Sequence, residues 1–360
     1  MIYLDANASE PLRPEAYKAV LGAMEKAGNP ASLHMAGRAA RKILENARER
    51  VADFASARPA DVIFCAGATE ANALAIHALG AGRPILIGAT EHDAVRAAAP
   101  TAITIAVRQS GEVDLEALAA LLRQHPKALV CLMAANNETG VLHDIKSAAQ
   151  ICLEAGAILH VDAVQAVGRA KQDWLGLGAS SFALSGHKCG APLGAGALIT
   201  RPNLDIKALI KGGGQELGRR GGTPALPAIA GLAAALGAEY NAAQINSWRE
   251  QIEGFCLAQG ASLVGRGAPR LPNTSCLILP GIRAETQLIA LDMAGICVSS
   301  GSACSSGKVN ASHVLLAMGL HEQAGQAIRV SLPWNMKAGD VQKFQSAYAA
   351  LAARTLRNGV

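Results

Sequence analysis

The sequence contains few aromatic residues and few charged residues for its length. Of 360 residues, 3% are Phe, Trp or Tyr and 17% are charged, whereas 51% are hydrophobic. A core must therefore be built mainly from Ala, Leu, Ile and Val, and the chain is long enough for a large domain with a smaller one beside it. The net charge is +5, without a Lys/Arg cluster interleaved with aromatic residues. We therefore expect a small-molecule partner and no nucleic-acid partner.

Long apolar runs are also missing. One of the longest, residues 128–135, is far too short to span a bilayer, and residues 1–5 show no basic start leading into an apolar region. We expect no membrane partner and a cytoplasmic location. The eight cysteines are scattered without a C-x-x-C spacing, so nothing indicates a metal site or a redox pair, and most are expected to be inert core residues.

Between residues 61 and about 200, short apolar segments alternate with helical patterns. The strands predicted from these segments are 62–65, 84–87, 128–134, 157–161, 181–184 and 196–200. Helical spacing covers 15–27 and 35–57 before this region and 144–155 within it. Strands that alternate with helices predict an α/β fold with a parallel sheet covered on both faces. From about residue 262 the pattern changes, which predicts a second domain.

The apolar run that ends near Leu184 is followed at once by Ser185, Gly186, His187 and Lys188. This pattern places Lys188 at the carboxyl end of a strand, the edge where open α/β sheets bind ligands. A lysine that is desolvated there can lose its proton and form a Schiff base with a carbonyl. A solvated loop lysine is the alternative, and it would be preferred if this residue stood alone.

Other strand ends supply further chemistry. Ala68 and Thr69 follow a glycine and begin a helix, where free N–H groups could bind a phosphate, although an ordinary capped helix fits as well. His92 could act as general acid or base or stack on a ring, and a core or capping histidine is equally compatible. Asn137 could bind a cofactor oxygen or make a turn.

Asp162 closes the set of strand ends. A carboxylate at the end of a buried strand is costly unless a cation pairs with it, and a protonated pyridine nitrogen would serve, as would a structural ion pair. One cofactor, pyridoxal 5'-phosphate, would use all the groups expected at this sheet edge: a phosphate cradle, an imidazole, an amide, a buried carboxylate and a reactive lysine.

Five motifs resemble, in order and spacing, those of the group I cysteine desulfurases, fold-type I pyridoxal phosphate enzymes of the class V aminotransferase family. They are Gly-Ala-Thr-Glu at 67–70, Glu-His at 91–92, Asn-Asn-Glu-Thr-Gly at 136–140, His-Val-Asp-Ala-Val-Gln at 160–165 and Ser-Gly-His-Lys at 185–188. The likeness covers nearly the whole chain. It implies a large domain at 15–250 with a mainly parallel seven-stranded sheet, and a smaller α+β domain from 1–14 and 251–360 that carries the catalytic cysteine loop.

The resemblance also implies roles for individual residues. Lys188 would hold the cofactor, His92 would stack on its ring, and Cys304 would accept the sulfur. The remaining implied cofactor contacts are Asp162 with the ring nitrogen, Asn137 and Gln165 near the phenolic oxygen, and Ala68, Thr69, Ser185 and His187 with the phosphate. Thr223 would reach the phosphate from the other subunit of a homodimer, and Asn29 with Arg329 would bind the substrate carboxylate.

The implied reaction converts L-cysteine to L-alanine and leaves a persulfide on Cys304. The sulfur would then pass to an acceptor protein for iron–sulfur cluster assembly or thiolation. Three residues depart from the family pattern: Ala6, Leu193 and Leu217. Another class V enzyme, such as a selenocysteine lyase, an aminotransferase or an epimerase, would share the site without needing Cys304. A nicotinamide dehydrogenase is disfavoured because no Gly-x-Gly pair is completed by the third glycine.

Overall fold

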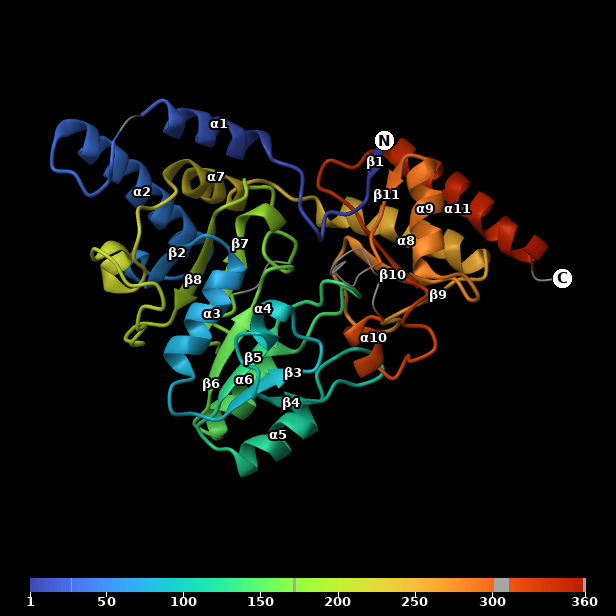
Figure 1. Cartoon of the computed structure of the whole chain (residues 1–360), viewed down its shortest axis with the longest axis horizontal. Coiled ribbons are helices and arrows are strands. Elements are labelled where there is room, and N and C mark those ends of the chain that lie inside the picture. The colour runs from blue at the N-terminus through green and yellow to red at the C-terminus, as the bar shows by residue number, and fades with distance from the viewer. Residues whose placement is uncertain (27, 171–172, 301–310, 359–360) are drawn as a thin grey trace.

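The structure, a computed structural model, describes residues 1–26, 28–170, 173–300 and 311–358, with side chains described as far as residue 353. Two groups of elements lie next to each other (Figure 1). One is built on a large sheet, and the other gathers the N-terminal strand with the elements that follow residue 241.

The large sheet has seven strands and is mixed but mostly parallel. In spatial order they are β2 (Val62–Cys65), β8 (Gly196–Thr200), β7 (Ser181–Ser185), β6 (Ile158–Asp162), β5 (Leu129–Met133), β3 (Ile85–Gly88) and β4 (Ile103–Ile105). Strand β8 is antiparallel to both of its neighbours, and the other pairs are parallel. The predicted α/β fold and its strands are confirmed to within one or two residues. The sequence reading missed β4, because three residues are too few to show a pattern.

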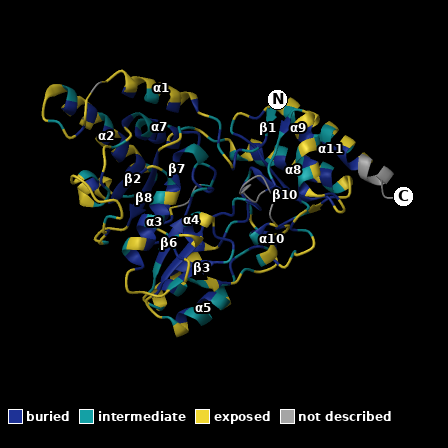
Figure 2. Ribbon diagram, viewed as in Figure 1, coloured by how far each residue is buried: buried dark blue, intermediate teal, exposed yellow. Residues whose placement is uncertain are grey.

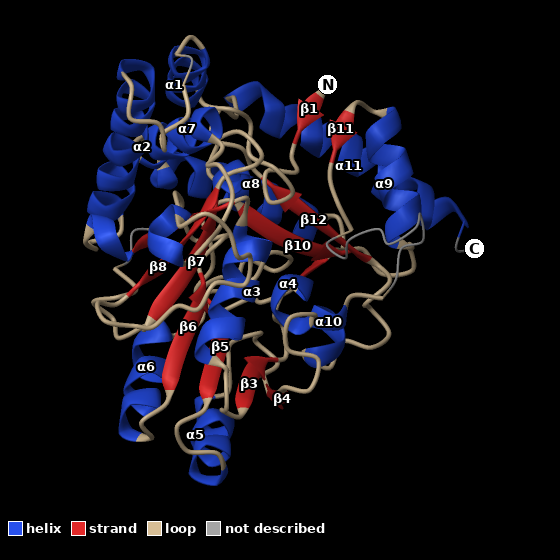
Figure 3. Ribbon diagram, turned by 60° about the vertical axis from the view of Figure 1, so that its left-hand side comes forward, coloured by secondary structure: helices blue, strands red, loops and turns tan. Residues whose placement is uncertain are grey.

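Helices cover both faces of this sheet (Figure 3). The helices of this group are α1 (Pro14–Met24), α2 (Met35–Phe54), α3 (Ala68–Leu79), α4 (Asp93–Arg96), α5 (Leu115–Gln124), α6 (Ile145–Glu154) and α7 (Leu226–Leu236). Alternate strand residues point to opposite faces. In β2, Ile63 packs in the core under α3 and α4, whereas Phe64 packs in the core under the other helices. Burial on both faces explains why these strands read as continuous apolar runs (Figure 2).

Three short 3-10 helices connect elements of the first group. They are η1 (Pro59–Asp61), η2 (Gly186–Lys188) and η3 (Gln215–Gly218). The second of these directly follows β7, so the backbone turns away from the sheet at the predicted catalytic lysine.

In its described residues, the second group contains two small sheets and four helices. Its strands are β1 (Ile2–Tyr3) parallel to β11 (Ile296–Cys297), and β10 (Thr274–Ile278) antiparallel to both β9 (Ser262–Leu263) and β12 (Ala327–Ser331). Its helices are α8 (Ala242–Ala258), α9 (Ala284–Met293), α10 (His313–Ala317) and α11 (Ala338–Asn358). Leu4 packs in one core with Ile245, Leu277 and Phe344. The N-terminus thus joins the C-terminal elements, and the two-domain boundaries stay a prediction.

Within the described ranges, no helix has both the length and the apolar composition needed to cross a bilayer.

Candidate active site

A cavity lies at the edge of the large sheet where β5, β6 and β7 end, and residues of the second group complete its wall. Its volume is about 450 Å³, within the roughly 300–1,000 Å³ common for small-molecule sites. Six predicted site residues line it from the sheet side: Ala68, Thr69, His92, Asn137, Asp162 and Gln165. Four more predicted residues also line it: Ser185, His187, Lys188 and Arg329. The structure therefore brings together the residues predicted from the strand ends with Gln165 and Arg329, whose roles only the family resemblance implied.

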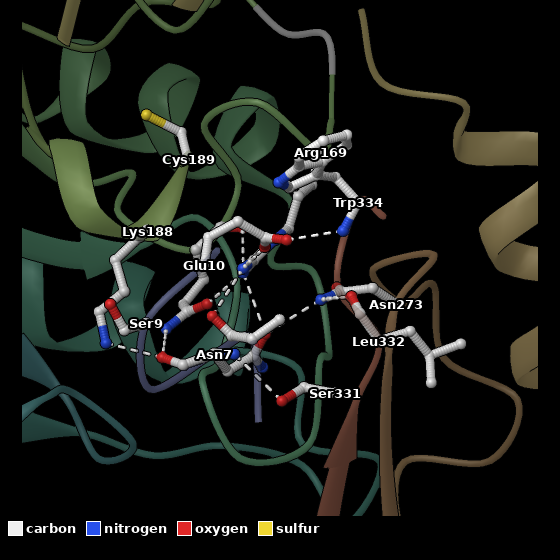
Figure 4. A network of polar contacts seen from close by, with 12 residues as sticks. Asn7, Ser9, Glu10, Arg169, Lys188, Cys189, Asn273, Ser331, Leu332 and Trp334 are labelled. Carbon is white, nitrogen blue, oxygen red and sulfur yellow. Dashed lines mark hydrogen bonds and ion pairs between the residues drawn. The ribbon is translucent and has the colours of Figure 1, made fainter. Parts of the chain in front are cut away.

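Lys188 directs its amine toward the N-terminal segment. Nζ donates hydrogen bonds to the carbonyl oxygens of Asn7 at 2.6 Å and Ala8 at 3.0 Å (Figure 4). Burial, with the nearby cations Arg329 and Arg169, lowers the pKa of Lys188 from 10.5 to about 8. An appreciable fraction of the amine is therefore unprotonated at mildly alkaline pH, which both Schiff-base formation and proton removal require.

The N-terminus of α3 opens into the cavity. Gly67 precedes the helix in an extended conformation, and in the described ranges the N–H groups of Ala68 and Thr69 have no acceptor. Free N–H groups at the positive end of a helix attract a phosphate. The hydroxyl of Ser185 is buried at the same wall. Burial lowers the pKa of His187 to about 4, so its ring is neutral and can still donate one hydrogen bond.

Asp162 ends β6 as a buried carboxylate that faces the cavity. Oδ2 accepts a hydrogen bond of 2.7 Å from the amide of Asn72, and Oδ1 accepts one of 3.1 Å from the N–H of Val164. Burial raises the pKa of Asp162, whereas these hydrogen bonds and the charges of His92 and Lys188 oppose the rise. A protonated pyridine nitrogen in the cavity would add a cation in direct contact.

His92 caps a helix and also lines the cavity. Its Nδ1 accepts a hydrogen bond of 3.0 Å from the N–H of Ala94 and so caps α4. The ring is also exposed and lines the cavity. The cap fixes the orientation of a ring that could stack on a flat cofactor, and that role stays a prediction.

Arg329 brings a positive charge to the cavity from β12. One guanidinium nitrogen pairs with the carboxylate of Asp5 at 2.6 Å, and another donates to the carbonyl oxygen of Asn137 at 3.1 Å. Its Nε is buried and has no hydrogen-bond partner within the part of the chain that the structure describes. The backbone of Ser299 pairs with that of Arg329, so residue 299 also lines the cavity.

Asn7 is a site residue that the sequence reading did not single out. Its carbonyl oxygen accepts from Lys188 and from Gln165, and its side-chain oxygen accepts from Arg169 at 3.0 Å and from Asn273 at 3.1 Å. Figure 4 shows the contacts from Lys188, Arg169 and Asn273 converging on it. The sequence analysis named only its neighbour Ala6, as a departure from the family pattern, and that says nothing about these partners.

Two predicted residues lie at other cavities, and a third is not described. Asn29 lines a separate cavity of about 580 Å³, beside the Gly-rich residues 213–214, and its side chain accepts from the N–H of Ala31. Thr223 lines a small cavity of about 70 Å³ that shares Gly194 with the main one. Cys304 lies outside the described residues. The roles expected of these residues stay predictions.

The residues present fit pyridoxal 5'-phosphate. Unpaired N–H groups at the start of α3 suit the phosphate, and the buried carboxylate of Asp162 suits a protonated ring nitrogen. The amine of Lys188, with its lowered pKa, suits the aldehyde carbon.

Comparison with known proteins supports this assignment. The family model described as aminotransferase class-V matches residues 2–344. A cysteine desulfurase from Cereibacter sphaeroides is 39% identical, with 95% of this chain and 93% of that protein covered. An IscS-like cysteine desulfurase from Mycobacterium tuberculosis is 34% identical, with 99% and 98% covered.

The solved structures give the same result. A NifS-like protein from Rickettsia africae matches with a TM-score of 0.91 and 34% identity, covering 98% of this chain and 99% of that one. SspA in complex with cysteine matches with a TM-score of 0.82 and 28% identity, covering 93% and 99%. The chain therefore belongs to the class V aminotransferase family and, within it, to the pyridoxal phosphate-dependent cysteine desulfurases.

Proposed function

We propose that this chain removes the sulfur atom of L-cysteine, releases L-alanine and holds the sulfur as a persulfide on Cys304. The observation that carries the proposal is the meeting of Lys188, Asp162 and the start of α3 in one cavity that also contains Arg329. Bound pyridoxal phosphate would supply an electron sink for the bonds at the Cα and Cβ atoms of the substrate.

Lys188 is the proposed base. Its pKa of about 8 leaves part of the amine free to take the Cα proton and return it elsewhere on the substrate. The carbonyl oxygens of Asn7 and Ala8 hold the amine when it is not bonded to another group. The ring of His92, oriented by its cap on α4, is the second proposed proton carrier.

Arg329 is the proposed anchor for the substrate carboxylate. Its Nε has no acceptor within the described ranges, and its partner Asp5 keeps the guanidinium plane in place. A carboxylate held there would position the Cα atom toward Lys188, and correct placement of reacting atoms is a large part of catalysis. Asn29 was predicted to share this role and, within one chain, lies at another cavity.

Sulfur transfer needs a thiolate, and the described residues that flank the 301–310 segment support Cys304 for this role. Ser299, five residues before it, lines the cavity. On the other side, the ring of His313 contacts the carbonyl oxygen of Glu91, next to His92, at 3.0 Å. The Cys304 sulfur would bond to the substrate sulfur as the Cβ–S bond breaks, giving alanine and a persulfide with no external oxidant.

We further propose a homodimer in which Thr223 reaches the phosphate of the other subunit. Support comes from Leu217, which is 77% exposed and has a left-handed backbone with φ of 59° in the same Gly-rich segment. A fully active monomer in analytical ultracentrifugation would contradict this. We also propose the 15–250 and 1–14 plus 251–360 domains, although Ile245 in α8 already packs in the second core.

We also propose a sulfur-acceptor protein and a cellular location. A sulfur-acceptor protein serving iron–sulfur cluster assembly or thiolation would take the persulfide sulfur. A cytoplasmic location is supported by the seven described cysteines, all of which are free.

The test is to follow purified protein by visible absorption before and after L-cysteine, with analysis of products. We expect a yellow protein whose spectrum changes with L-cysteine, one alanine formed per sulfur released, and one added sulfur on the peptide that contains Cys304. Uptake of no pyridoxal phosphate would overturn the proposal. Alanine and sulfide formation without sulfur on Cys304 would favour a lyase that does not use this thiol.

A further inference from the structure

A line of buried polar side chains leads from the interior of the large sheet to Asp162. Ser181 Oγ lies 2.9 Å from Nδ1 of His160, and Nε2 of His160 lies 2.9 Å from Oδ1 of Asn72. The amide nitrogen of Asn72 then donates to Oδ2 of Asp162 at 2.7 Å. Ser181, His160 and Asn72 are all 0% exposed. None of the three lines the cavity, so the reaction itself does not use them.

The direction of the hydrogen bonds follows from the carboxylate. An ionised Asp162 can only accept, so Asn72 presents its NH₂ group to Asp162 and its carbonyl oxygen to His160. His160 must then donate through Nε2, which leaves Nδ1 to accept from the hydroxyl of Ser181. Every donor therefore points toward Asp162, and hydrogen bonds aligned in one direction strengthen one another.

The state of the histidine is consistent with this direction. Burial lowers the pKa of His160 to about 3, so the ring is neutral and keeps one donor and one acceptor. Residues 160 and 181 face each other in the parallel pairing of β6 and β7, which fixes the distance between the ring and the hydroxyl.

Helix α3 connects this line to the phosphate end of the site. Thr69 lies in its first turn, and Asn72 follows three residues later, which puts both on the same side of the helix. One helix thus lines the phosphate end of the cavity with Thr69 and reaches the ring end through the hydrogen bond from Asn72 to Asp162.

We propose that Asn72 and His160 are positioning residues, which hold the Asp162 carboxylate ionised and aimed at the ring nitrogen of pyridoxal phosphate. This inference rests on the proposed function. In the described ranges, the charged or titratable groups that face Asp162 from neighbouring elements are Lys188, His92, Glu91 and Cys131, and burial raises the pKa of the Cys131 thiol. Burial, together with the charge of Asp162, raises the pKa of Glu91 well above its ordinary value, which favours the protonated form beside the carboxylate.

The test measures cofactor affinity rather than turnover. Cofactor-free protein is titrated with pyridoxal phosphate and with an analogue in which CH replaces the ring nitrogen. We expect Asn72→Leu to weaken pyridoxal phosphate binding by about tenfold or more, the worth of a charge-assisted hydrogen bond. Affinity for the analogue should change by less than about twofold, because the analogue has no ring nitrogen for Asp162 to bind.

A second pair of variants covers the case in which Asn72→Leu does not fold. His160→Gln can still donate a hydrogen bond to Asn72, whereas His160→Phe cannot. The Gln variant should therefore still bind pyridoxal phosphate more tightly than the analogue, and the Phe variant should lose most of that difference in affinity. His143→Gln is the matched control, because His143 is equally buried and neutral but contacts the N–H of Val113 instead.

A spectroscopic measurement separates positioning from mere packing. With cofactor labelled at the ring with ¹⁵N, the wild type and His160→Gln should show a protonated ring nitrogen at pH 8, and His160→Phe a partly deprotonated one. Equal losses of affinity for both ligands, or an unchanged ¹⁵N signal in His160→Phe, would overturn this inference and leave the proposed function standing. A wild-type chain that binds neither ligand would overturn both.

Discussion

The amine of Lys188 and the main-chain carbonyl oxygen of Asn7 are joined by a hydrogen bond of 2.6 Å, although 181 residues separate them. The side chain of Asn7 donates to Thr274 Oγ1 at 2.9 Å, and its N–H donates to the hydroxyl of Ser331 at 3.0 Å. Lys188 belongs to the large-sheet group, whereas Thr274 and Ser331 lie on strands of the second group. Asn7 therefore connects the lysine to both halves of the molecule.

Replacing Asn7 with Ala should lower the stability of the protein and, by shifting the carbonyl that holds Lys188, also lower turnover. The change removes the acceptor shared by Arg169 and Asn273 and the donor to Thr274, and buried groups left without partners cost about 1–3 kcal/mol each. Urea denaturation should show a loss of about 2 kcal/mol or more. The exposed Asn335→Ala is a control with little expected effect. Unchanged stability and turnover would show that the Asn7 contacts are not needed.

The capture of pyridoxal phosphate by cofactor-free protein should depend on the protonation of Lys188. Only the neutral amine attacks the aldehyde, so the rate should rise with pH and reach half its maximum near pH 8 instead of 10.5. Arg329→Gln removes a nearby cation and should move the midpoint upward. Stopped-flow absorption measures the rate, and Lys188→Ala should give no product that borohydride can fix. A midpoint above pH 10 would contradict the lowered pKa.

Acid should destabilise the folded chain through its buried histidines. Burial lowers the pKa of His160 to about 3 and of His143 to about 4, whereas both are near 6.5 when unfolded. Between pH 6.5 and 4 the unfolded chain binds protons that the folded chain does not, so the free energy of unfolding falls as the pH falls. From pH 7.5 to 5.5 each histidine should account for about 1.4 kcal/mol. Urea titrations of the cofactor-free proteins at the two pH values measure this loss. The free energy of unfolding of His160→Gln should fall by that much less than that of the wild type, and an equal fall in both would contradict the lowered pKa of His160.

Replacing Cys304 with Ser should stop sulfur transfer but not cofactor binding. A hydroxyl cannot match a thiolate as a nucleophile toward sulfur and cannot store a persulfide. Alanine and sulfide production should fall together, on the order of a thousandfold, while L-cysteine still changes the visible spectrum. Cys297→Ser, in β11, is the control and should retain most activity. Undiminished sulfide release by the Cys304 variant would exclude this thiol.

The large sheet and the core of the site could be read from the sequence because both depend on local patterns. Strands buried on both faces are continuous apolar runs, and their polar ends must meet because carboxyl ends of parallel strands share an edge. Thr69, Asp162 and Lys188 were found in this way. The family motifs added roles to residues whose spacing alone left two interpretations, such as His92.

Only the tertiary structure decided which distant residues meet. Asn7 reaches Lys188 because the N-terminal segment crosses between the two groups of elements. The spacing of apolar residues along the sequence does not predict that crossing. The line from Ser181 through His160 to Asn72 depends on how α3 packs against β6. Asn29 and Thr223 lie outside the main cavity for the same reason. The sequence by itself determined the strands and the chemical groups at their ends, whereas contacts between elements far apart in the chain were decided by side-chain packing, which residue spacing does not encode.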